Sequence, residues 1–123
     1  MRTTTAALQG LHQALDAPRG HGTTLGTWRW AVRQRMAGVR DVLISETAHH
    51  ENAWLAARGG SVLRERNILL GRLTSMGSQV LENEAVDEVR LELKRLIDDI
   101  RHHVQRLHDL AYDEVELELG GSE

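Results

Sequence analysis

Apolar residues return at helical spacing through most of this chain. The longest such stretch covers residues 84–119, which contain no proline and no glycine. Its apolar positions return at helical spacing, mostly three or four residues apart: Val86, Val89, Leu93, Leu96, Ile97, Ile100, Val104, Leu107, Ala111 and Val115. That spacing predicts one long amphipathic helix whose apolar stripe must be covered by other helices. No stretch alternates apolar and polar residues in the manner of a strand, so we predict no sheet.

Turn residues divide the rest of the chain into three more helices. We expect these helices at residues 3–16, 25–57 and 61–81, and in the first of them Leu8, Leu11 and Leu15 form the apolar stripe. Pro18 and the glycines beside it end the first helix, because they cannot continue a helix without cost. Gly59 and Gly60 end the second helix, and Thr23 or Thr24 can cap its start.

Short loops between helices make neighbouring helices antiparallel. We therefore predict an all-α fold, an up-down-up-down four-helix bundle with a short first helix. Residues 1–119 are assigned to a single domain and residues 120–123 to a flexible tail. The short first helix leaves part of the groove between the other three uncovered. We expect leucine and valine side chains to be exposed there, and a second copy of the chain to cover them in a homodimer.

Composition narrows the class of protein. A chain of 123 residues with 41% hydrophobic residues supports one soluble core, and the absence of cysteine excludes disulfides and thiolate metal sites. No apolar run approaches the roughly 18 residues of a membrane span, and the first residues lack a secretory signal, so we expect a cytoplasmic protein with no membrane partner. The net charge of −3 argues against nucleic-acid binding. One feature of this chain also occurs on nucleic-acid-binding surfaces, namely the mixture of aromatic and basic residues in Trp28-Arg29-Trp30 and the arginines that follow.

A helical wheel identifies the polar residues that face inward. The inner face of the second helix is expected at Leu25, Val32, Met36, Val39, Leu43, Trp54 and Ala57. His50 falls inside this stripe, and Glu46 lies one turn earlier at its edge, at i and i+4. The inner face of the third helix is expected at Leu63, Leu70, Leu73, Gly77 and Leu81, with Arg66 and Asn67 among them. In the fourth helix His103 and His108 flank the stripe and His102 points outward. Counting from the turns predicts one polar layer that contains Glu46, His50, Arg66, Asn67 and His103, with His108 further along.

The end of the chain then suggests a relationship. The run from His103 to Glu114, closed by Gly120-Gly121, resembles the last helix of small hemerythrin-like (HHE cation-binding) proteins. Residues 11–15 and 63–67 are similar too. The resemblance implies a helical bundle with metal ligands in the pattern His, His-x3-Glu, His-x3-His and His-x4-Asp along its four helices. Here the second helix has the reversed order Glu46-x3-His50, and the third helix has no histidine.

Several interpretations of the polar layer remain open. The first is a hydrogen-bonded layer without metal, in which Arg66 pairs with Glu46 and fixes the helix register. The second is one divalent ion, zinc or iron, held by Glu46, His50 and His103, with His108 as a further candidate ligand. A di-iron oxygen site is a third. No nucleophile elbow or phosphate-binding loop is present. We therefore expect a non-catalytic binding or interaction module of degenerate hemerythrin-like type, or else a metal-binding sensor or oxygen-handling protein.

Overall fold

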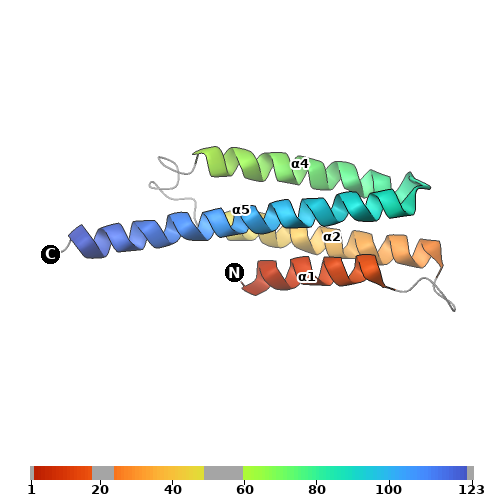
Figure 1. Ribbon diagram of the computed structural model, residues 1–123, viewed down its shortest axis with the longest axis horizontal. Helices are drawn as coiled ribbons and strands as arrows, with labels where there is room; N and C mark the ends of the chain where they lie inside the picture. Colours follow the sequence, from red (N-terminus) through yellow and green to blue (C-terminus); the bar gives the residue numbers. More distant parts are fainter. Residues whose placement is uncertain (1, 18–23, 49–59, 122–123) are drawn as a thin grey trace.

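The described part of the chain forms four helices (Figure 1). The computed structural model describes residues 2–17, 24–48 and 60–121. Its elements are α1 (Arg2–Asp16), α2 (Leu25–Ala48), α4 (Gly60–Glu82) and α5 (Val86–Gly121). The described residues contain no strand, which confirms the predicted all-α class. None of the described helices has an apolar stretch long enough to cross a lipid bilayer.

The helices lie side by side, and Figure 1 shows successive helices running in opposite directions. α1 and α4 each pack against both α2 and α5. Hydrogen bonds join the start of one helix to the end of a neighbouring helix. Arg29, near the start of α2, donates from Nη2 to the carbonyl of Asn83 just after α4 at 3.2 Å. Arg90, near the start of α5, donates from Nε to the carbonyl of Leu15 at the end of α1 at 3.0 Å.

Two side chains cap helix starts. The hydroxyl of Thr24 accepts a hydrogen bond from the backbone N–H of Thr27 at 3.1 Å, which confirms it as the N-cap of α2. In the turn between α4 and α5, Asn83 Oδ1 accepts from the N–H of Ala85 at 2.8 Å. The N–H of Asn83 donates to the carbonyl of Gln79 at 2.9 Å. Asn83 therefore forms hydrogen bonds at the end of α4 and at the start of α5.

The core follows the predicted apolar stripes in three of the helices. In α1, α2 and α5 the buried side chains lie three or four residues apart, and they include Leu8, Leu11, Leu15, Trp28, Val32, Met36, Val39, Leu43, Val89, Leu93, Leu96, Ile97, Ile100, Val104 and Leu107. Leu25 was expected on this face but is exposed. It lies in the first turn of α2, next to the residues that cap the helix.

The inner face of α4 differs from the prediction by one residue. Val62, Leu69, Leu73 and Val80 are buried, whereas Leu81 is exposed. Pairs of neighbouring apolar residues in this helix left two faces almost equally apolar, so its pattern did not select one. Packing against α2 and α5 selects the face.

The first helix covers one end of the bundle only (Figure 1). α1 has 15 residues, against 36 in α5. We expected exposed leucine and valine beyond its reach. Val104 and Leu107 are buried, and the α5 side chains that follow Asp109 lie outside those that the structure describes. Leu107 packs instead with Val62 of α4 in a small separate cluster.

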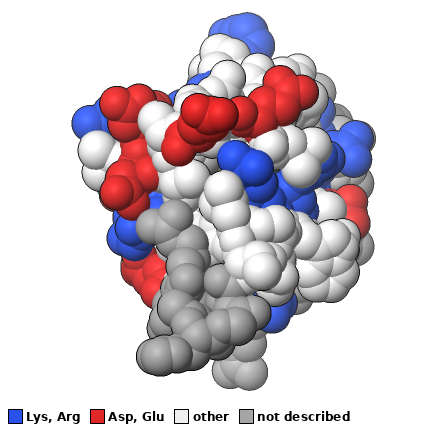
Figure 2. All heavy atoms as spheres, turned by 90° about the vertical axis from the view of Figure 1, so that its right-hand side faces the viewer, with Lys and Arg blue, Asp and Glu red and all other residues white. Residues whose placement is uncertain are grey.

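Ion pairs hold the end of α1 to α5. Asp16 Oδ1 lies 2.8 Å from Arg90 Nη2 and 2.7 Å from Lys94 Nζ. Hydrogen bonds from Lys94 and Arg90 lower the pKa of Asp16 below its ordinary value. Figure 2 looks at the end of the bundle where α5 begins, and acidic and basic side chains lie next to one another there.

The limits of two helices bear on the prediction in different ways. α5 continues to Gly121, so its backbone extends into the segment that we expected to be a tail. The second helix is described as far as Ala48. The part of it that we predicted at residues 49–57 lies outside the described residues.

Candidate functional site

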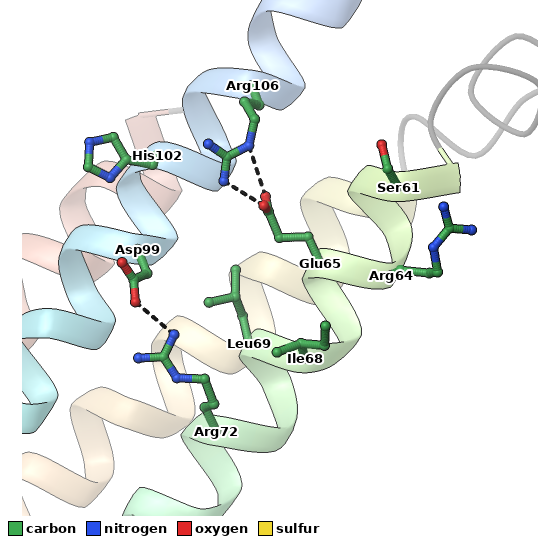
Figure 3. Close-up of a pocket in the computed structure, with 9 residues that line it drawn as sticks. All are labelled: Ser61, Arg64, Glu65, Ile68, Leu69, Arg72, Asp99, His102 and Arg106. Carbon is green, nitrogen blue, oxygen red and sulfur yellow. Dashed lines mark hydrogen bonds and ion pairs between the residues drawn. The ribbon is translucent and has the colours of Figure 1, made fainter.

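His103 is the centre of the polar residues that α4 and α5 bring together. Its side chain is 0% exposed, on the inner side of α5. Its Nδ1 lies 2.7 Å from Oε1 of Glu65 on α4. Arg106, one turn along α5, donates from Nη2 to Glu65 Oε2 at 2.6 Å and from Nε to Oε1 at 3.2 Å. A single carboxylate from α4 therefore joins two side chains of α5, and Figure 3 shows its bonds to Arg106.

Protonation states follow from this geometry. Burial raises the pKa of Glu65, but the hydrogen bonds from Arg106 and His103 lower it by more than burial raises it. The pKa of Glu65 therefore lies below its ordinary value. An ionised carboxylate can only accept hydrogen bonds, so Nδ1 of His103 carries the hydrogen and donates it. In the neutral ring Nε2 is then left with a lone pair. This nitrogen is buried and has no hydrogen-bond partner among the described residues.

Sequence reasoning missed Glu65. The wheel for α4 was one residue out of register, which placed Glu65 off the inner face and Asn67 on it. A usable signal was present in α5, where His103 and Arg106 are three residues apart and therefore lie on one side of the helix. A buried imidazole beside an arginine requires an acceptor, and Glu65 is the acidic residue of α4 at that level.

The other predicted members of the polar layer have different outcomes. Arg66 is half-buried, as an inward position requires, and its Nη2 donates to Asn67 Oδ1 at 3.2 Å. Asn67 itself is exposed, so the prediction that it lies in the layer is wrong, because the true inner face of α4 is rotated away from it. His108 is half-buried, and His102 is exposed as predicted.

The predicted residues of α2 fall outside what the structure describes. Glu46 belongs to α2, but its side chain is not among those described, and His50 lies in the undescribed segment 49–59. Among the described residues, no three His, Asp or Glu side chains are placed to hold a metal ion. That part of the chain offers the unpartnered Nε2 of His103 as one ligand atom and does not hold an ion by itself.

A groove runs over these ion pairs between α4 and α5 (Figure 3). Its volume is about 590 Å³, and its walls are Ser61, Arg64, Glu65, Ile68, Leu69, Arg72, Asp99, His102 and Arg106. Arg72 closes one end of the groove through a 2.7 Å ion pair with Asp99. Ile68 is 64% exposed, and Figure 3 shows Arg64 pointing away from Glu65. The groove therefore offers an apolar side chain between charged ones.

Comparisons with known proteins add no relative. A scan of protein-family models, a search of curated proteins and a search of solved structures each found no match.

Proposed function

We propose that this chain is a small cytoplasmic interaction module of degenerate hemerythrin-like type, which binds another protein and performs no catalysis. The observation that supports the proposal is the closed ion-pair network at Glu65. Both carboxylate oxygens have partners from α5, at 2.7 Å from His103 and 2.6 Å from Arg106. A carboxylate satisfied in this way links α4 to α5 without a metal ion.

The groove above the network is the surface that we assign to the partner. Exposed Ile68 lies between Arg64 and Arg72 along its wall. Arginine and apolar side chains together are typical of protein interfaces, where arginine is enriched. The partner surface that suits this groove carries an apolar side chain flanked by carboxylates.

Site-specific photo-crosslinking tests the partner surface. Benzoylphenylalanine is placed at Ile68 of the full chain, and the protein is irradiated in an extract of the cells that produce it naturally. The matched control has the same group at Leu91, which is 53% exposed on α5 and does not line the groove. We expect one discrete protein to be crosslinked from position 68 alone. The same products from both positions would contradict the proposal.

A second function has its own supporting observation, the buried Nε2 of His103. In many metal sites the ligand histidine donates its other N–H to a carboxylate, which fixes the ring and raises its basicity. The hydrogen bond from His103 to Glu65 has this form. The alternative is therefore a metal-binding sensor or oxygen-handling protein in which His103 binds zinc or iron together with Glu46 and His50, and with His108.

Metal analysis separates the two functions. The protein is purified without chelator, its zinc and iron contents are measured, and its melting temperature is recorded with and without added ions. The interaction module predicts no stoichiometric metal and no change in melting temperature. Stoichiometric metal that is lost in both His103→Ala and His50→Ala would establish the alternative. His102→Ala is the matched control, because His102 is exposed.

A further inference from the structure

Arginines in the bundle differ in whether they have acidic partners. Most of those on α4 and α5 form ion pairs with carboxylates, namely Arg72, Arg90, Arg95, Arg101 and Arg106. Arg33 and Arg40 on α2 are exposed and form no ion pair within the described part of the chain. Two exposed cations seven residues apart therefore lie on one face of α2.

Arg33 and Arg40 belong to a regular stripe along α2. They alternate with apolar residues at intervals of three and four, in the order Trp30, Arg33, Ala37, Arg40 and Ile44, which we call the α2 stripe. All five residues are exposed, and Trp30 is 66% exposed. Intervals of three and four are those of a coiled-coil seam, where one helix packs along another. Arg33, Ala37 and Arg40 also line a hollow of about 300 Å³ between α2 and α4.

The sequence of α5 contains a stripe of residues with the same spacing and opposite charge. Its residues are Gln105, Asp109, Tyr112, Glu116 and Leu119, which we call the α5 stripe. Gln105 and Asp109 are exposed, so the stripe begins on the side of α5 that faces away from its own core. Gln105 Nε2 donates to Asp109 Oδ1 at 2.9 Å, and Asp109 has no cationic partner among the described residues.

The C-terminal part of α5, which includes Glu116 of the α5 stripe, is rich in acidic residues. Four of the six residues at 113–118 are acidic, and they lie toward the C-terminus of a helix. The helix dipole disfavours negative charge at that end, so cations from another surface would stabilise it.

We propose that two copies of this chain form a dimer in which the α2 stripe of each copy packs against the α5 stripe of the other. This inference rests on the proposed interaction function and names a second copy as one partner. In antiparallel register Arg33 lies opposite Glu116 and Arg40 opposite Asp109, because both pairs are seven residues apart. Small Ala37 then lies opposite Tyr112. A two-fold axis repeats the contact, so the dimer contains two seams.

A second copy explains the α2 stripe better than a nucleic acid does. The spacing of its cations matches that of the carboxylates in this same chain. The net charge of −3 opposes the approach of a polyanion.

Charge reversal on each side of the seam tests the dimer. One variant carries R33E and R40E, and the other carries D109R and E116R. Each variant alone places like charges opposite one another in both seams, whereas a mixture of the two restores opposite charges in both. The matched control carries R35E and R95E, which change the same charge at exposed arginines outside both the seam and the groove. Sedimentation velocity over a concentration series measures association, and circular dichroism checks that each variant is folded.

We expect the wild-type chain and the control to form dimers, each variant alone to associate at least about tenfold more weakly, and the mixture to recover dimerisation. R33Q/R40Q replaces the first variant if that variant does not fold. A monomeric wild-type chain, or a dimer that neither variant weakens, would overturn the proposal. Binding of a short single-stranded oligonucleotide by a monomer, lost in R33E/R40E, would assign the α2 stripe to nucleic acid instead. None of these results depends on crosslinking at Ile68, so the two proposals can fail separately.

Discussion

Replacing Glu65 with leucine is expected to destabilise the bundle by about 2 kcal/mol at neutral pH. The substitution removes the acceptor that joins His103 and Arg106 across the interface between α4 and α5. The loss of this acceptor costs a different free energy at each of its two partners. His103 is 0% exposed, so its Nδ1–H is left buried without an acceptor, which costs about 1–3 kcal/mol. The side chain of Arg106 is 51% exposed and is rehydrated, which costs about 0–1 kcal/mol.

A double-mutant cycle with His103→Leu isolates the buried contact. Replacing both hydrogen-bonding partners by apolar side chains removes the unsatisfied group, so the double variant should be less destabilised than the sum of the two single variants. We expect a coupling energy of about 1–2 kcal/mol, measured from urea unfolding of the full chain. The matched control is Asp99→Leu, which breaks an ion pair in the same groove whose two side chains are 40% and 49% exposed. That variant should lose no more than about 1 kcal/mol.

The same cycle has a defined pH dependence. Burial raises the pKa of Glu65 and the hydrogen bonds from Arg106 and His103 lower it more, so the folded value lies below the ordinary value of 4.5. The carboxylate therefore contributes its full stability above pH 4.5 and loses it as the pH falls through the folded pKa. The difference between wild type and Glu65→Leu should shrink only in that acidic range. If the free-energy losses of Glu65→Leu and His103→Leu are strictly additive, Glu65 is not the buried acceptor of His103. A Glu65→Leu variant as stable as wild type would refute the same assignment.

Three further predictions concern the fold. Leu11→Ala should lower the free energy of unfolding by about 2–5 kcal/mol, because Leu11 is buried in the core, and urea titration measures this loss. Asn83→Ala should cost about 1 kcal/mol by removing the acceptor at the start of α5, and a cost near zero would contradict the capping role. Lys94 and Arg90 lower the pKa of Asp16, so its contribution to stability is present above the ordinary value of 3.8 and is lost at lower pH. Asp16→Asn should remove that part of the pH dependence of the urea midpoint. An unchanged pH dependence would argue that the ion pairs of Asp16 with Arg90 and Lys94 do not stabilise the contact between α1 and α5.

The sequence by itself determined the class of fold and the core faces of three helices. In α5 most of the apolar residues recur on one side, so the helical period alone assigned Leu93, Ile97 and Ile100 to the core. Pro18 and Thr24 gave the end of α1 and the start of α2 because their effects on the backbone are local. These features depend on residues close together in the chain, where spacing along the sequence is also spacing along a helix.

Only the tertiary structure decided the rotation of α4 and the partner of His103. Neighbouring apolar residues such as Leu69 and Leu70 make two faces of α4 nearly equivalent, and contact with α2 and α5 selects between them. That one-residue rotation moved Asn67 to the surface and brought Glu65 to His103. Such a pairing joins residues 38 positions apart, and it forms because a buried imidazole requires an acceptor within hydrogen-bond reach.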